Sequence, residues 1–196
     1  MAMQKFLSVL IFLSGAFFLA FGASATDVLR AEFTQTKTLA GFERALTSSG
    51  TVVIYSDLGL IWQQLTPFES NIKISKEKMT SRTGHGTPEV VSLSDRTDSY
   101  SIPQLVQAVF SGNDNVLATC FNVEKESISG GKVRYTITPK TKEGFPLFLS
   151  ATVIKTTDVE RVDMIDAAKN KTTILFTNTR YKRLTQSDAN REFQDQ

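Results

Sequence analysis

The stretch from Ser48 to Ser75, SSGTVVIYSDLGLIWQQLTPFESNIKIS, restricts the fold more than any other part of the chain. A β-branched and aromatic run is followed by apolar residues at every second position, which is typical of half-buried strands. These positions are Leu58, Leu60 and Trp62, and later Ile72 and Ile74. Turn residues at Asp57–Gly59 and Thr66–Pro67 separate the segments. The pattern therefore predicts three consecutive strands with one strongly apolar face, which carries the only Trp.

The first 25 residues have the pattern of a secretory leader. Lys5 precedes an apolar run from Phe6 to Phe21, and Ala23-Ser24-Ala25 places small residues where a signal peptidase cleaves. The run is shorter than the ~20 residues that a membrane-spanning helix needs. We expect residues 1–25 to be a signal peptide cleaved after Ala25, and residues 26–196 to form a single domain in the periplasm.

The charge balance and the cysteine count exclude some classes of protein. Loss of Lys5 with the leader lowers the basic residues from 22 to 21, against 20 acidic residues. This near-neutral balance argues against a nucleic-acid partner. The single Cys120 allows no internal disulfide, so the core alone has to stabilise an exported domain.

The rest of the chain predicts two short helices and several more strands. Helical spacing of apolar residues places the helices at Asp27–Lys37 and Ile102–Ser111, and the polar tail from Gln186 is expected to be loose. The further strands are expected at Lys78–Arg82, Glu89–Leu93, Leu117–Val123, Val133–Ile137, Leu147–Ile154, Val159–Ile165 and Thr172–Phe176. Because the strands come in runs, the prediction is an α+β fold with an antiparallel sheet.

Several short motifs, taken in order behind a signal peptide, resemble the periplasmic outer-membrane lipoprotein carrier family (LolA-like), in a divergent branch. They are Phe33-Thr-Gln35, Leu39-Ala-Gly-Phe42, Ser49-Gly50, Gly59-Leu-Ile-Trp62 with Pro67 after it, and Thr172–Asn178, which is similar to the last long strand of the family. The resemblance implies an incomplete, strongly curved antiparallel β-barrel. Short helices, expected here at Asp27–Lys37 and Ile102–Ser111, would form a lid over an apolar cavity.

The resemblance also implies a function without catalysis, cofactor or metal. Such a carrier takes the acyl chains of a lipoprotein from an inner-membrane transporter and passes them to an acceptor at the outer membrane. We expect it to act as a monomer and to bind an acylated lipoprotein or another lipid-like cargo. The divergent branch is associated with export of glycolipids or polyene lipids, which is the alternative cargo.

One position departs from the pattern of the family. Its better-known members carry an Arg six residues before the matching Trp and just ahead of a Pro, and this Arg bonds the lid helices. Here the position is Ser56, followed by Asp57. The usual coupling of lid opening to loading is therefore not expected in this chain.

The large apolar side chains on the predicted strands and helices are compatible with two interpretations, the lining of a cavity or an ordinary filled core. Alternation alone does not distinguish the two. The resemblance favours a cavity. The residues predicted to bind cargo are Phe33, Tyr55, Leu58, Leu60, Trp62, Phe68, Ile72, Ile74, Phe110, Phe145 and Phe148. A periplasmic interaction or structural module with a filled core is the alternative.

An exported lipid hydrolase or transferase is the rival from the enzyme class. The sequence contains no G-x-S-x-G, H-E-x-x-H, P-loop or G-x-G-x-x-G motif. The only His, His85, lies between two glycines, where an exposed loop residue is expected. It forms a nucleophilic pair with Cys120 only if the fold brings the two together.

Overall fold

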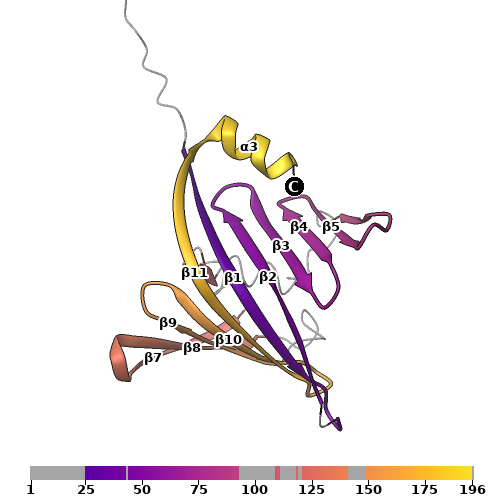
Figure 1. Cartoon of the computed structure of the whole chain (residues 1–196). Helices are drawn as coiled ribbons and strands as arrows, with labels where there is room; N and C mark the ends of the chain where they lie inside the picture. The colour runs from indigo at the N-terminus through magenta and orange to yellow at the C-terminus, as the bar shows by residue number, and fades with distance from the viewer. Residues whose placement is uncertain are drawn as a thin grey trace, which may run out of the picture.

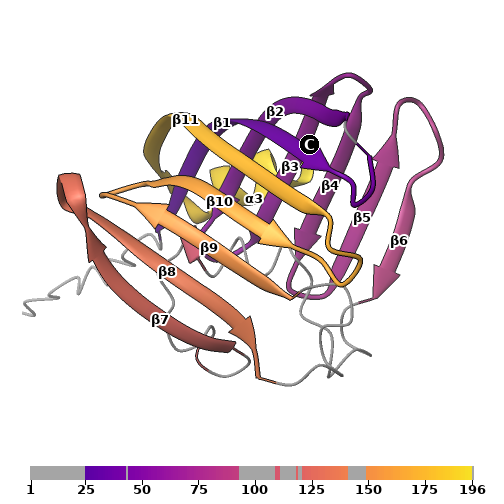
Figure 2. The same cartoon turned by 90° about the horizontal axis from the view of Figure 1, so that it is seen from below.

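The computed structural model describes residues 25–42, 44–92, 109–110, 118, 121–140 and 149–195. Within these residues, eleven strands form one sheet in the spatial order β6-β5-β4-β3-β2-β1-β11-β10-β9-β8-β7. Every pair of neighbouring strands is antiparallel. The sheet curls strongly, as Figures 1 and 2 show, but β6 and β7 remain its two edges, so it does not close.

The strands occupy most of the described chain. They are β1 Ala25–Thr38, β2 Ala45–Tyr55, β3 Gly59–Thr66, β4 Ser70–Ser75, β5 Lys78–Thr83, β6 Glu89–Ser92, β7 Phe121–Ile128, β8 Lys132–Pro139, β9 Ser150–Lys155, β10 Val159–Ile165 and β11 Lys171–Thr185. A 3-10 turn, η1 Ser129–Gly131, joins β7 to β8, and the helix α3 Gln186–Asp195 follows β11. The predicted strands around Ser48–Ser75 are confirmed as β2, β3 and β4.

Both faces of the sheet are apolar near its centre, and they belong to two separate cores. On the inner face, which faces into the curl, Leu29, Ile54 and Leu60 lie on adjacent strands and belong to the larger core. On the outer face, Val28, Val53 and Ile61 form a smaller core with residues of α3. Because neighbouring residues of a strand point to opposite faces, the two cores share the same strands.

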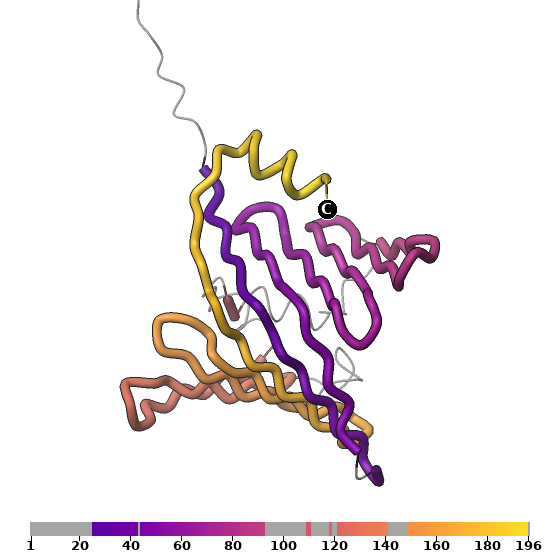
Figure 3. The backbone as a smooth tube through the Cα atoms, viewed as in Figure 1, coloured from indigo at the N-terminus to yellow at the C-terminus, as the bar shows by residue number. Residues whose placement is uncertain are grey.

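The segment Asp27–Lys37 is a strand, so the predicted N-terminal helix is wrong. It lies within the 14-residue strand β1, which pairs with β2 on one side and β11 on the other. Figure 3 shows β1 and β11 side by side along their length. Val28 and Leu29 are both buried, one in each core. Burial on both faces removes strict alternation and imitates helical spacing.

The prediction that the tail from Gln186 is loose is also wrong. The tail forms the ten-residue helix α3, which lies across the outer face of the sheet (Figure 1). Its Ala189 and Phe193, four residues apart, are buried in the outer core. Thr185 Oγ1 accepts a hydrogen bond from the Asp188 backbone N–H at 3.2 Å, which caps the start of the helix.

These two corrections change the fold class. The described chain is mostly β, with α3 on the outer face, rather than an α+β fold with a helical lid. One expected lid helix is β1. The other, Ile102–Ser111, lies outside the described residues except for Val109 and Phe110, which are helical. No helix within the described ranges is long and apolar enough to cross a bilayer.

A polar network fastens α3 to the sheet. The Glu192 carboxylate accepts hydrogen bonds from the Tyr55 hydroxyl, at 2.6 Å, and from the Arg30 guanidinium. Burial raises the pKa of the Tyr55 phenol, and Glu192 raises it further. Burial alone would also raise the pKa of Glu192, but the bonds from Tyr55 and Arg30 outweigh it and hold that pKa below its ordinary value.

Gly50 allows β2 and β3 to approach each other closely. It lies opposite Phe33 of β1 and Gln64 of β3, beside an irregularity in the β2–β3 register. A Cβ atom at this position would overlap the Gln63 carbonyl oxygen. The Ser49-Gly50 motif lies in the middle of β2.

We expect Gly50→Ala to lower the free energy of unfolding by about 3 kcal/mol or more, because the methyl group forces two strands apart. Chemical denaturation measures the change. Gly41→Ala is the control, since Gly41 has a φ of +82° but a Cβ atom added to it would meet nothing within 4 Å, and it should lose only about 1 kcal/mol. Equal losses in the two variants would contradict the close approach.

Glu192→Gln should lower the free energy of unfolding by about 1 kcal/mol at neutral pH, because it weakens the bonds to Tyr55 and Arg30. A carboxylate whose folded pKa is depressed stabilises the protein above its unfolded pKa and loses this effect as the pH falls through the folded value. The difference between wild type and variant should therefore shrink below the ordinary pKa of 4.5. A difference that is constant from pH 7 to pH 3 would rule out this role for Glu192.

Candidate functional site

The inner face of the sheet is a continuous apolar wall. Buried residues from both halves of the sheet join in it, including Ile54 on β2, Ile74 on β4, Ile137 on β8 and Val153 on β9. Partly buried residues complete the wall: Trp62, Ile72, Met79, Phe110, Val123 and Tyr135. Such a surface can hold hydrocarbon chains.

Four aromatic rings form the centre of this wall. Phe33 on β1 stacks on Trp62 on β3, with ring centroids 4.0 Å apart and an interplanar angle of 30°. Phe176 on β11 meets Trp62 edge to face at 6.3 Å, and it meets Phe110 edge to face at 4.8 Å. Phe33 and Phe176 are buried, whereas Trp62 and Phe110 are only partly buried. The cluster therefore has two anchored rings and two rings that retain an accessible surface.

A polar rim bounds the aromatic wall toward the β1–β2 loop. Gln35 is the next residue after Phe33 that points to the inner face, and it lies opposite Ser48 of β2. Its Nε2 donates a hydrogen bond of 3.4 Å to Ser48 Oγ. Gln64 follows Trp62 and donates a hydrogen bond to the Phe68 carbonyl at 2.9 Å. Exposed large apolar residues lie beyond this rim, namely Phe42, Leu46, Leu65 and Phe68.

The structure brings six of the predicted cargo-binding residues together on the inner face. Phe33, Leu60 and Ile74 are buried there, and Trp62, Ile72 and Phe110 pack against them. Trp62 and Ile72 are direct partners across the β3–β4 ladder, as are Leu60 and Ile74.

The other five predicted residues are not placed in this group. Tyr55 and Leu58 belong to the outer core beneath α3. Tyr55 is one residue past the inner-facing Ile54, and Leu58 lies in the turn that ends the alternation. Phe68 is 74% exposed in the β3–β4 turn. Phe145 and Phe148 lie outside the described residues.

The structure adds Phe176 to the site, a residue that sequence reasoning placed in a strand but not in the cavity. It lies opposite Phe33 in the β1–β11 ladder and is 6% exposed. The sequence contained a pattern that could have identified Phe176, because Ile174 and Phe176 alternate with polar or exposed neighbours along the strand. Met79, Val123 and Tyr135 were also missed. Met79 is the one apolar residue of β5, whereas Val123 and Tyr135 lie on strands that the sequence did predict, without assignment to the site.

Ser56 and His85 lie away from the inner wall. Ser56, where the family resemblance implied an Arg, is an exposed turn residue whose Oγ accepts a hydrogen bond from the Asp27 backbone N–H at 3.2 Å. His85 is exposed in the turn between β5 and β6, as expected. Cys120, its suggested partner in an enzyme, lies outside the described residues.

Comparison with known proteins identifies a family. The family model described as "Outer membrane lipoprotein carrier protein LolA" matches residues 24–190. A search of curated proteins gives no match.

Several solved structures resemble the fold at low sequence identity. A LolA superfamily protein from Nitrosomonas europaea is 11% identical, with 82% of this chain and 89% of that chain covered and a TM-score of 0.47. A domain from Vibrio parahaemolyticus described as an outer membrane lipoprotein-sorting protein is 11% identical, with 87% and 92% covered and a TM-score of 0.41. A DUF1329 family protein from Desulfovibrio piger is 12% identical, with 79% and 85% covered and a TM-score of 0.36. The family assignment rests on the family model rather than on these likenesses.

We expect Phe176→Ala to lower the free energy of unfolding by about 3–5 kcal/mol, because it removes a buried ring that contacts both Trp62 and Phe110. Trp62 emission should shift to longer wavelength as its environment becomes wetter. Leu175→Ala is the matched control: Leu175 is adjacent on β11, points to the outer face and is 44% exposed, so its loss should stay below about 1 kcal/mol. Similar losses in both variants would contradict the assignment of faces on β11.

Proposed function

We propose that this chain, which belongs to the family of the outer membrane lipoprotein carrier protein LolA, shields the acyl chains of a lipoprotein or another lipid-like cargo against the inner face of its sheet. Membership of the family indicates a carrier-type function in general. The single observation that supports the proposed binding surface is the apolar inner wall, with Trp62 and Phe110 partly accessible at its centre.

The energetic problem of such a carrier matches the chemistry of this wall. Each buried CH₂ of an acyl chain contributes about 0.8 kcal/mol, so exposing ~16 carbons to water costs roughly 10 kcal/mol or more. A soluble carrier has to provide an apolar surface of similar extent. The partly buried residues Trp62, Ile72 and Phe110 are suited to this contact, because a chain can cover them without displacing the fully buried core.

The open sheet supports release as well as binding. Since β6 and β7 are not paired with each other among the described strands, the curl can widen without breaking a ladder of backbone hydrogen bonds. Ser56 provides no cation to hold a lid at the position where the family resemblance implied one. We infer that loading and release in this chain depend on the curl of the sheet rather than on a latch at position 56.

The proposed route runs through the periplasm without a catalytic step. An inner-membrane transporter would deliver the cargo, and an acceptor at the outer membrane would receive it. Membership of the carrier family supports binding rather than chemistry. Residues 1–25 would direct export and then be removed.

A brominated fatty acid tests the wall directly, because the chain contains one Trp and it lies in the proposed site. We expect the brominated chain to quench Trp62 fluorescence in a saturable way. Ile72→Glu should weaken this binding by about tenfold or more, because it places a carboxylate beside Trp62.

The matched control is Leu175→Glu, which adds the same charge to the outer face of β11 and should bind like wild type. Absence of quenching in the folded wild-type protein would favour the alternative, an interaction module with a filled core. Native mass spectrometry of protein isolated from the periplasm then identifies the cargo. A bound lipoprotein, or a glycolipid or polyene lipid in its place, distinguishes the two proposed cargo classes.

A further inference from the structure

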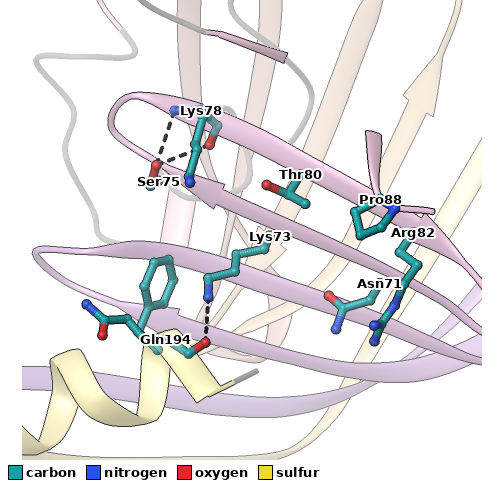
Figure 4. A pocket seen from close by; sticks show the side chains of 9 residues that line it. Asn71, Lys73, Ser75, Lys78, Thr80, Arg82, Pro88 and Gln194 are labelled. Atoms are coloured by element: carbon teal, nitrogen blue, oxygen red, sulfur yellow. Dashed lines mark hydrogen bonds between the residues drawn. The ribbon is translucent and has the colours of Figure 1, made fainter. Parts of the chain in front are cut away.

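A second concave site lies on the outer face of the sheet, opposite the proposed cargo wall. It is a groove of about 410 Å³ between the end of α3 and the strands β4 and β5. Figure 4 shows the side chains of both strands and of α3 around it. The residues that define its chemistry are Asn71, Lys73, Lys78, Arg82, Phe193 and Gln194.

The groove is positively charged. Lys73, Lys78 and Arg82 line it, and none of the described residues that line it is acidic. Their placement follows from strand pairing, because Asn71 lies opposite Arg82 and Lys73 lies opposite Thr80. Side chains at these positions share the outer face and are close enough to contact one ligand. Within the described part of the chain, Lys78 and Arg82 form no ion pair.

Lys73 is held in place toward the groove. Its Nζ donates a hydrogen bond to the Gln194 carbonyl at 3.3 Å and lies 4.7 Å from the centroid of the Phe193 ring. Burial lowers the pKa of Lys73, and the charge of Lys78 lowers it further, whereas Asp195 opposes both effects. An anion in the groove would offset the repulsion between the two cations.

Asn71 is a polar residue beside these cations whose side-chain oxygen has no hydrogen-bond partner among the described residues. Its Oδ1 is buried and accepts no hydrogen bond. No described hydrogen bond fixes the amide, so it can turn without losing one and present its NH₂ group or its oxygen to a ligand. Its position opposite Arg82 places it next to the guanidinium.

We propose that this groove binds a phosphate group, carried by a phospholipid headgroup or by a soluble phosphate ester. Arg82 offers a planar fork of donors, and the Asn71 amide opposite it can turn its NH₂ group toward the same ligand, a combination that suits phosphate oxygens. A phosphate with up to two negative charges also balances three cations better than one carboxylate does. The groove has room for more than the phosphate alone, so the rest of the ester extends along the Phe193 wall.

The anion binds at the Arg82 end of the groove. At the other end, the C-terminus of α3 presents carbonyl groups with partial negative charge, and Lys73 already bonds one of them. The site is independent of the proposed cargo wall, because its residues lie on the opposite face of β4.

The test is a titration of the full chain with inorganic phosphate and with glycerol 3-phosphate, followed by backbone amide NMR shifts in β4 and β5. We expect saturable shifts that Arg82→Gln weakens by about tenfold. Lys76→Gln is the matched control, because it removes the same charge from the exposed β4–β5 turn without lining the groove. It should change the affinity less than about twofold. No shifts, or equal weakening by both variants, would overturn the proposal.

Vesicles distinguish the two sources of phosphate. If Arg82→Gln reduces flotation with phosphatidylglycerol vesicles more than Lys76→Gln does, the ligand is a phospholipid headgroup. If both variants float like wild type while Arg82→Gln still weakens binding of glycerol 3-phosphate, the ligand is a soluble ester. Quenching of Trp62 by the brominated fatty acid should be unchanged in Arg82→Gln, so failure of this site and failure of the cargo wall give different results.

Discussion

The contact between Phe33 and Trp62 across β2 is the constraint on which the inner face depends. The strands β1 and β3 flank β2, so their axes lie about 9–10 Å apart, yet the two ring centroids are 4.0 Å apart. They meet above the part of β2 where Gly50 has no side chain. Any larger residue there would overlap the Gln63 carbonyl oxygen and push β3 away. Gly50 thus permits the close approach of β2 and β3 next to the aromatic pair.

The sheet uses its two faces for different purposes. In the centre, β1 to β3 contribute every other residue to the inner core and the intervening residues to the core beneath α3. Because α3 seals the outer face with Ala189, Phe193 and the Glu192 network, the inner face does not have to provide the whole stability of the domain. That division is what allows Trp62 and Phe110 to remain partly accessible on the inner wall.

The sequence could predict those parts of the fold in which one face of a strand is buried and the other is exposed to solvent. The segments β3 and β4 alternate clearly beyond the turn at Leu58, so their existence and the inner position of Leu60, Trp62, Ile72 and Ile74 followed from period two. In β1, burial on both faces erased the alternation and favoured a helix. In α3, the sequence pattern for a helix was short. Thr185 and Asp188 form a capping pattern. Ala189 and Phe193 lie four residues apart, but the residues around them are polar. The face of Tyr55 depends on its pairing with Val28, which no local pattern contains.

The aromatic cluster bears on how the proposed cargo would be admitted to a wall whose side chains are already packed together. An edge-to-face aromatic pair contributes about 0.5–1.5 kcal/mol beyond its buried area, so the contact of Phe110 with Phe176 is weak compared with the roughly 10 kcal/mol that an acyl chain gains by leaving water. Moving the partly buried Phe110 ring aside for a chain would therefore cost much less than burial of the chain contributes, and it would leave the Phe33–Trp62 stack intact. Phe33 and Phe176, which are buried, stay in place and keep the sheet curled. Under the proposed carrier function, such a wall would need no empty cavity before loading, because Phe110 would cover it again when the cargo leaves.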